Sequence, residues 1–226
     1  MHDCRFIRTF VKEKKTKTRK YNRQMKLILL TTPDFFIQEN TIINALFAEG
    51  LDILHILKPN SEPAYCERLL KLIDKQWHKK IVTHEHFYLK SEFKLRGIHL
   101  SPRNPAPPAK YRGHVSCSCY NLEDVERRKP KCDYVFLSQI FQGITRPDLE
   151  GSFSSDELYA AKKRGVIDSK VMAFGGISAD RLDEIRDYGF GGVVIFGDIW
   201  KRFDYHLSSS YKGVINYFKL LRSKSE

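Results

Sequence analysis

Two glycine-containing junctions near the carboxyl end of the chain are the residues whose types and spacing most directly predict chemistry. Gly175-Gly176 follows one apolar run, and Phe196-Gly197 ends the next. Glycine lets backbone N–H groups approach an anion closely, and a helix N-terminus adds a favourable dipole. The two junctions therefore predict a phosphate-binding site, against the alternative that the glycines only permit tight turns between strand and helix.

A second anion-binding element is predicted at Thr145-Arg146, in the loop that follows the apolar run Tyr134–Leu137. The hydroxyl and the guanidinium lie side by side, and arginine presents a fork of donors that fits phosphate oxygens. Two such elements at one end of a fold indicate a substrate with more than one phosphate group, or two phosphorylated substrates.

The elements that must position these residues are short apolar runs that alternate with helical patterns from Lys26 onward. The runs are rich in Val, Ile and Leu, as parallel strands buried on both faces are. We predict strands at Lys26–Thr31, Ile53–Leu57, Lys80–Thr83, Gly97–Leu100, His114–Ser118, Tyr134–Leu137, Lys170–Phe174 and Gly192–Phe196. We predict helices at Thr41–Glu49, Glu62–Trp77, Leu122–Arg128, Ser155–Arg164 and Ala179–Tyr188.

This alternation predicts an α/β fold, a single (β/α)8 TIM barrel, with an open doubly wound sheet as the main competitor. Ser154 with Glu157 predicts a capping box, and Ser178 an N-cap. The Pro-rich run Ser101–Pro108 is expected to be a loop. In a barrel, function collects at the carboxyl ends of the strands, which is where the glycine pairs and Thr145-Arg146 fall.

The net charge of +12 is concentrated at the amino end of this 226-residue chain. Residues 1–24 hold nine Lys and Arg against Asp3 and Glu13, a net of +7, which leaves +5 for residues 25–226. We interpret 1–24 as a basic, disordered extension and 25–226 as the barrel. A nucleic-acid or membrane-surface tail and a targeting peptide are the alternatives, and an apolar run of about 7–15 residues typical of a secretory signal is absent.

The five cysteines form an odd count without metal-ligand spacing, which is typical of reduced thiols in a cytoplasmic protein. Cys117 and Cys119 share one face of their strand, opposite Ser116 and Ser118, and are expected to pack behind it. No run approaches the roughly 18 apolar residues of a membrane span, so we expect no membrane partner.

Three histidines, His55, His84 and His99, come at or near the ends of adjacent predicted strands. Zinc requires three or four ligands that converge, and strand alternation sends His84 and Glu85 to opposite sides, so a zinc or iron site is disfavoured. We expect His99 to fill a layer of the barrel interior and to donate to a backbone group.

The order of these motifs resembles the thiamine phosphate synthase and TenI superfamily over about Lys26–Trp200. The matching segments are ILHILKP, VTHEH, GIHLSPRN, VSCSCYNLEDVERRKPKCDYVFLSQIFQGITRP and the segment from Lys170 to Trp200. Synthases of this family are (β/α)8 barrels that join hydroxymethylpyrimidine diphosphate to thiazole phosphate with Mg2+ and release pyrophosphate. The resemblance implies that pyrophosphate leaves first and that the thiazole nitrogen captures the pyrimidine cation, so cations are needed and a strong base is not.

The resemblance implies roles residue by residue. Ser116 matches a serine that contacts pyrophosphate, and Arg146 keeps the positive charge of that loop. The thiazole phosphate is expected to bind at Thr145, Gly175, Gly176, Phe196 and Gly197.

Several positions depart from the family pattern. His55 and Leu57 stand where the family has Gln-x-Arg, so we expect Lys58 to replace the lost arginine. Glu85 remains as a candidate Mg2+ ligand, while Asn104 replaces an aspartate. Ser118 replaces the histidine that carries the proton in TenI tautomerases.

Three functions therefore follow from the sequence. The first is a thiamine phosphate synthase with Ser116, Arg146, Lys58 and His55 as catalytic residues. The second is a thiazole tautomerase that uses His55 or His84 as the acid–base group. The third is a non-catalytic accessory protein that binds thiazole phosphate.

Overall fold

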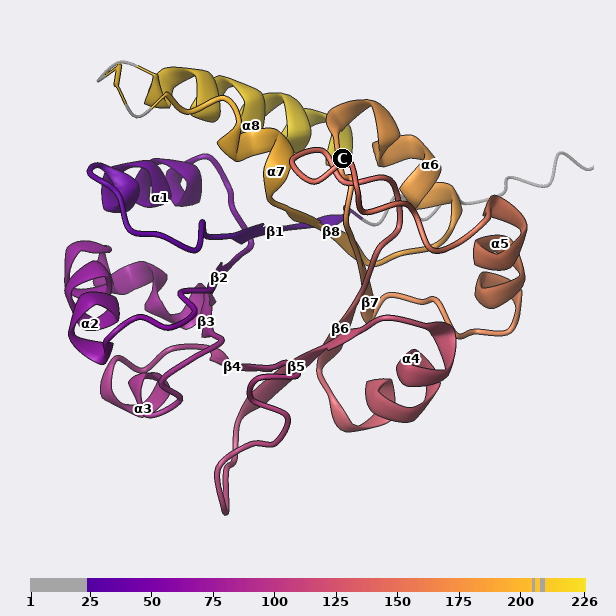
Figure 1. The fold of residues 1–226 in the computed structure, drawn as a ribbon, viewed down its shortest axis with the longest axis horizontal. Helices are drawn as coiled ribbons and strands as arrows, with labels where there is room; N and C mark the ends of the chain where they lie inside the picture. The colour runs from indigo at the N-terminus through magenta and orange to yellow at the C-terminus, as the bar shows by residue number, and fades with distance from the viewer. Residues whose placement is uncertain (1–23, 205, 208–209) are drawn as a thin grey trace, which may run out of the picture.

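The structure is a computed structural model that describes residues 24–226 except 205 and 208–209. Within these residues, eight parallel strands follow one another around a closed barrel, and β1 completes it by pairing with β8 (Figure 1). The predicted (β/α)8 barrel is confirmed, and closure excludes the open doubly wound sheet. Residues 1–23 of the predicted extension lie outside the described residues, so the division at residue 24 stays a prediction.

The observed strands agree with the predicted ones to within one residue at each end, because their apolar runs are bounded by polar or glycine-rich segments. They are β1 Lys26–Leu30, β2 Ile53–Ile56, β3 Ile81–Thr83, β4 Gly97–Leu100, β5 His114–Cys119, β6 Tyr134–Leu137, β7 Val171–Phe174 and β8 Gly192–Ile195.

The helices cover the outside of the barrel (Figure 1). They are α1 Glu39–Ala48, α2 Pro63–Leu72, α3 Leu89–Glu92, α4 Leu122–Arg128, α5 Ser155–Lys163, α6 Leu182–Asp187, α7 Gly197–Trp200 and α8 Tyr211–Ser225. Shorter 3-10 segments are η1 Lys75–Lys80, η2 Lys129–Lys131 and η3 Ala179–Arg181. The predicted helices at 62–77 and 179–188 are therefore each divided, the first by a break after Leu72 and the second by an opening 3-10 turn.

The predicted capping box is confirmed, because Ser154 accepts from the Glu157 N–H and Glu157 accepts from the Ser154 N–H at the start of α5. Ser178 does stand at the N-cap position before η3, but its side chain accepts no capping hydrogen bond there.

Alternation along the strands separates an inner from an outer core. The inner core fills the barrel and consists of Ile28, Leu30, Ile53, Val82, Tyr134, Phe136, Met172 and Val194. The larger outer core lies between strands and helices and includes Cys117 and Cys119. These two thiols do pack behind β5, as predicted.

The connection between β4 and β5 is unlike the others. Residues 101–113 contain no helix and form a loop that extends away from the barrel (Figure 1, below β4 and β5). The predicted Pro-rich loop is confirmed, and Ser101 and Asn104 close its base through a backbone bridge. Every other connection carries at least one helix, so the outer face of the barrel is least covered here.

No helix in the described part of the chain combines the length and the apolar character needed to cross a lipid bilayer.

Candidate functional site

A cavity of about 390 Å³ opens at the carboxyl ends of β6, β7 and β8. The six residues predicted for anion binding all line it, namely Thr145, Arg146, Gly175, Gly176, Phe196 and Gly197. The lining of the cavity also includes Tyr120, Gln139, Phe174 and Ile177. The loop after β6 and the two glycine junctions, which are far apart in the sequence, are therefore one site.

Backbone geometry requires glycine at the β7 junction. Gly175 and Gly176 have φ values of 96° and 68°, in the left-handed region, and a Cβ on Gly176 would lie 2.4 Å from the Gln142 carbonyl oxygen. The N–H groups of these two glycines donate to no carbonyl of the described residues. They are therefore available to an anion in the cavity.

The junction that follows β8 forms another wall of the cavity. Gly197 begins α7, so its N–H has no acceptor within the helix. A Cβ on Gly197 would lie 3.0 Å from Thr145 Cγ2, which shows how closely this backbone approaches the Thr145 side chain. Backbone donors and a hydroxyl thus meet at one point, as phosphate binding requires.

Arg146 lies at the rim and is held by an acid. Its Nε and Nη2 donate to Asp148 Oδ1 and Oδ2 at 2.9 and 2.6 Å, and the two side chains are 65% and 60% exposed. Exposed ion pairs contribute little to stability. A phosphate group entering the cavity can therefore take the place of Asp148.

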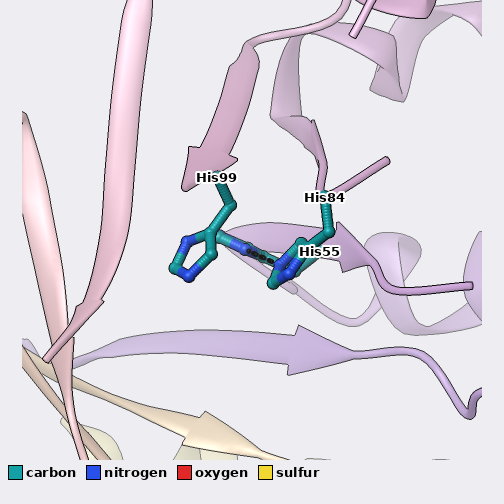
Figure 2. A group of neighbouring side chains, drawn as sticks. All are labelled: His55, His84 and His99. Carbon is teal, nitrogen blue, oxygen red and sulfur yellow. Dashed lines mark hydrogen bonds between the residues drawn. The ribbon is translucent and has the colours of Figure 1, made fainter. Parts of the chain in front are cut away.

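Inside the barrel, at the side of β2 and β3, two histidines are hydrogen-bonded to each other. His55 Nδ1 lies 2.9 Å from His84 Nε2 (Figure 2). His55 Nε2 lies 2.6 Å from the Tyr134 hydroxyl. His55 is fully buried and His84 is 4% exposed. His55 is therefore part of the barrel interior and does not line the cavity.

His99 continues the polar layer toward β5. Its Nδ1 and Nε2 lie 2.9 Å from the hydroxyls of Ser116 and Ser118, respectively. His99 does fill a layer of the barrel, but the predicted backbone partner is wrong. The serines that alternation places inside β5 satisfy both ring nitrogens. Ser116 also hydrogen-bonds Tyr134, which joins the two halves of the network.

Burial keeps this network neutral. It lowers the pKa of His84 to about 3 and, together with the neighbouring imidazoles, lowers the pKa of His55 and His99 well below 6.5. Burial also raises the pKa of Tyr134 above its ordinary value. At neutral pH the layer therefore consists of uncharged donors and acceptors.

The three imidazoles form the one cluster of candidate metal ligands in the described residues, since each offers a nitrogen within 4.8 Å of the others. The rings of His84 and His99 stack at 4.2 Å with an interplanar angle of 17°. In-plane lone pairs of stacked rings run parallel and do not converge on one ion, whereas tetrahedral zinc requires convergence. The arrangement fits a hydrogen-bonded layer better than a metal centre.

Lys58 is placed away from the cavity. Its Nζ lies 2.6 and 2.9 Å from the two carboxylate oxygens of Glu39 and donates to the Asp34 carbonyl at 2.8 Å. The Lys58 and Glu39 side chains are 0% and 2% exposed. Burial raises the pKa of Glu39 to about 7 and lowers that of Lys58. This pair ties the start of α1 to the end of β2.

Glu85 follows β3 on the side opposite to His84. Its Oε2 accepts from the Lys58 N–H at 3.0 Å and its Oε1 accepts from Arg103 at 3.1 Å. Asn104 donates to the His84 carbonyl at 2.9 Å, so its side chain is turned to the backbone. Glu85 is thus the carboxylate at this edge, with the Arg103 guanidinium beside it.

Sequence reasoning did not single out Tyr120 and Gln139, which line the cavity, or Arg103, which pairs with Glu85. Arg103 follows β4 and is 52% exposed, while Tyr120 and Gln139 follow β5 and β6 and line the cavity. All three come just after the carboxyl end of a strand. That position was the available signal, and their residue types alone carried none.

The fold and the site together define a (β/α)8 barrel with a glycine-lined cavity at the carboxyl ends of its strands. The sequence profile of thiamine monophosphate synthase, TMP-TENI, matches residues 29–199. The crystal structure of thiamine phosphate pyrophosphorylase from Bacteroides thetaiotaomicron is 54% identical, with a TM-score of 0.83 over 88% of this chain and 97% of that one. The chain therefore belongs to the thiamine monophosphate synthase family, which confirms the resemblance seen in the sequence.

More distant structures share the fold alone. Thiamine phosphate pyrophosphorylase from Pyrococcus furiosus is 16% identical with a TM-score of 0.68, over 90% of this chain and 96% of that one. The tryptophan synthase alpha subunit from Legionella pneumophila is 14% identical with a TM-score of 0.63, over 90% and 93%. A search among curated proteins found no match.

The buried pair of Lys58 and Glu39 leads to a first prediction. Glu39→Gln leaves the lysine buried without its partner and should lower the free energy of unfolding by about 3–5 kcal/mol. Glu39→Gln combined with Lys58→Met removes both charges and should recover most of that loss. Urea unfolding of the three proteins measures this. A double variant as unstable as the single one would contradict it.

The neutral histidines lead to a prediction about pH. Because the folded pKa values of His55, His84 and His99 lie below the unfolded value of 6.5, the unfolded chain binds more protons in acid. Stability contributed by neutral His84 is present above pH 6.5 and is lost as the pH falls toward about 3. Each such histidine adds a slope of up to about 1.4 kcal/mol per pH unit.

The unfolding free energy of His84→Asn, measured by urea denaturation between pH 7 and pH 4, should fall less steeply with decreasing pH than that of the unmodified protein. The difference in slope should correspond to up to one proton. The comparison with the unmodified protein cancels the opposite contribution of Glu39, whose raised pKa favours the folded state as the pH falls. Parallel curves for the two proteins would show that His84 is not held neutral.

Proposed function

We propose that the protein is a thiamine phosphate synthase, a transferase that joins hydroxymethylpyrimidine diphosphate to thiazole phosphate and releases pyrophosphate. The observation that carries the proposal is the 54% identity to a thiamine phosphate pyrophosphorylase over nearly the whole barrel. The cavity at β6–β8 supports it, because all six predicted anion-binding residues meet there. We place the reaction in the cytoplasm, in keeping with the free thiols of the barrel.

The thiazole phosphate is assigned to the glycine junctions. The N–H groups of Gly175, Gly176 and Gly197 donate to its oxygens, and the Thr145 hydroxyl adds a further donor. Because these donors are fixed by backbone, the phosphate fixes the position of the thiazole ring. The thiazole nitrogen is thereby held ready to attack.

The pyrophosphate must be stabilised as it leaves, since it takes the electron pair of the broken C–O bond. Arg146 at the rim can exchange Asp148 for phosphate oxygens, and Arg103 lies on the opposite edge beside Glu85. We assign this charge stabilisation to the two arginines. Lys58 is assigned to holding the β1–α1 connection, because Glu39 already occupies its ammonium group.

The edge of the site at Glu85 and Arg103 offers a magnesium ion a single carboxylate ligand. Mg2+ uses one or two carboxylates together with substrate phosphates and water, and Glu85 supplies one carboxylate there. Glu85 would hold the ion, with Arg103 released to the diphosphate. When bound, the ion neutralises charge on the departing pyrophosphate.

The pyrimidine cation needs protection from water before the thiazole nitrogen captures it. Phe174 and Phe196 contact the inner core below and line the cavity with their rings. Aromatic faces attract a delocalised cation and exclude water. His55 and Ser116, buried in the layer below, are assigned to positioning this floor rather than to touching substrate.

The tautomerase alternative is less well supported. It needs a group that accepts and returns a proton near neutral pH, and position 118 is a serine. His84 has its pKa lowered to about 3 and His55 is fully buried between two partners. Neither histidine is poised to carry a proton at pH 7.

The central prediction is turnover. The full chain supplied with hydroxymethylpyrimidine diphosphate, thiazole phosphate and Mg2+ should release pyrophosphate, and omission of Mg2+ should reduce the rate. Coupled pyrophosphate detection measures it. Tight binding of thiazole phosphate without any release would favour the accessory-protein alternative, and isomerisation of a thiazole carboxylate phosphate without Mg2+ would favour the tautomerase.

Arg146→Ala should lower kcat/KM by about 10- to 100-fold, since a hydrogen bond to a charged group contributes about 1.5–3 kcal/mol. The matched control is Arg127→Ala, which removes an exposed arginine that pairs with Asp124 on α4. Equal rates for Arg146→Ala and the unmodified protein would remove Arg146 from the mechanism.

Gly197→Ala should weaken the affinity for thiazole phosphate while leaving the protein folded. Its Cβ would lie 3.0 Å from Thr145 Cγ2 and 3.6 Å from Ile144 Cβ, in the space assigned to the phosphate. Gly213→Ala in α8, where the nearest atom is 3.6 Å away, is the control. Calorimetric titration measures the affinity, and unchanged binding would contradict the assignment of this junction.

A further inference from the structure

A second cavity, of about 350 Å³, lies on the outer side of β4 and β5, where no helix covers the barrel. The Pro-rich loop forms one wall with Pro105 and Pro107. The opposite wall contains the thiols of Cys117 and Cys132. Cys117, one of the two thiols expected to pack behind β5, therefore borders a cavity together with Cys132.

The two thiols are in contact with each other. Cys132 lies in the segment that precedes β6, and Cys117 lies in β5. Cys132 Sγ donates to Cys117 Sγ at 3.5 Å. The Asp133 N–H donates to the Val115 carbonyl at 2.8 Å and fixes the two segments in register. A disulfide needs about 2.05 Å between the sulfurs, so a shift of about 1.5 Å would join them.

The surroundings of the pair distinguish its members. Cys117 accepts hydrogen bonds from three groups, the thiols of Cys119 and Cys132 and the guanidinium of Arg128, and they lower its pKa. Arg128 lines the same cavity. The same hydrogen bond and burial raise the pKa of Cys132. These contacts favour the thiolate form at Cys117 and the thiol form at Cys132, the arrangement of a nucleophile and a resolving cysteine.

We propose that Cys117 and Cys132 form a peroxide-reactive dithiol, a modification site on the side of the barrel separate from the phosphate cavity. The Cys117 thiolate attacks one oxygen of hydrogen peroxide, breaks the O–O bond and becomes a sulfenic acid, and the released hydroxide takes up a proton to give water. The Cys132 sulfur then attacks the Cys117 sulfur, and water leaves with the sulfenic oxygen. Two thiols are oxidised, one peroxide is reduced, and a disulfide and two waters result.

The remaining thiols serve as internal comparisons. Cys66 lies on the buried face of α2, 3.4 Å from the Ser61 hydroxyl, and burial raises its pKa. No other thiol of the described residues hydrogen-bonds to it. Cys119 lies two residues from Cys117 on the same strand and forms part of the outer core.

The test treats the folded full-length protein with hydrogen peroxide, in a Cys4→Ser background so that the thiols followed belong to the barrel. We expect the loss of two hydrogens per chain and of two titratable thiols, reversed by a thiol reductant. Trypsin cleaves after Arg112, Arg127 and Lys131, so a disulfide should link peptide 113–127 to a peptide that begins at Cys132. Mass spectrometry detects that linked pair.

Single-residue variants identify which sulfur atoms form the disulfide. The disulfide should still form in Cys119→Ala and in Cys66→Ala. Cys132→Ala should lose the disulfide and leave a trappable sulfenic acid at Cys117. Arg128→Gln should slow the formation of the disulfide. Cys117 and Cys119 both lie in peptide 113–127, so fragmentation of the linked peptides from the Cys4→Ser protein places the link at one or the other, even if a cysteine variant fails to fold. Oxidation of Cys117 and Cys132 no faster than that of Cys66, or a link through Cys119, would overturn the proposal.

Discussion

Closure of the barrel between β1 and β8 is the constraint on which the rest of the structure depends. Four residue pairs, from Lys26 with Gly192 to Leu29 with Ile195, complete the ring of parallel strands. A Cβ on Gly192 would lie 2.4 Å from the Lys26 carbonyl oxygen, so glycine permits the approach. Once the ring is closed, all carboxyl ends meet at one mouth, and each strand residue is committed to the inside or the outside.

That commitment explains why β5 contributes to two unrelated environments. Ser116 and Ser118 point inward and satisfy His99, whereas Cys117 and Cys119 point outward. A buried polar group without a partner costs about 1–3 kcal/mol, so the inner serines and histidines are mutually necessary. The outer thiols have no such requirement, and their chemistry depends on what covers them.

The fold followed from the sequence because periodicity and glycine placement are local signals. The strands β4 and β6 have their predicted limits, and the glycine junctions at Gly175-Gly176 and Gly197 line one cavity. The partners of buried charges did not follow, because they depend on distances between segments. Lys58 was expected to face pyrophosphate, but it lies against Glu39, which is 19 residues earlier and carries no motif.

Local signals also failed for the polar layer. His55, His84 and His99 were each recognised near a strand end, yet their mutual contacts depend on the stagger of β2, β3 and β4 around the barrel. Their hydrogen bonds to Tyr134 and the serines require positions up to 79 residues away. Residue types set what each side chain can do, and register alone decides which of them meet.

The neutral interior has a consequence for how charge is handled at the mouth. The resemblance places an arginine where this chain has Leu57, whose side chain packs on the inner core. A cation there would be held by a strand in a region of low dielectric, where its attraction for pyrophosphate is strong. Here the assigned cations, Arg103 and Arg146, stand on loops, are exposed, and already pair with Glu85 and Asp148.

Such loop cations are screened by water and salt, and each must first leave its carboxylate. The backbone donors at Gly175, Gly176 and Gly197 carry no such cost, because their positions are fixed by the strands that precede them. On the proposed assignment, the thiazole phosphate end of the site is therefore preorganised, whereas the pyrophosphate end must be assembled by the substrate. On that same assignment, the glycine junctions fix where the thiazole phosphate lies, and the Arg103–Glu85 and Arg146–Asp148 ion pairs must rearrange before both arginines can bind pyrophosphate.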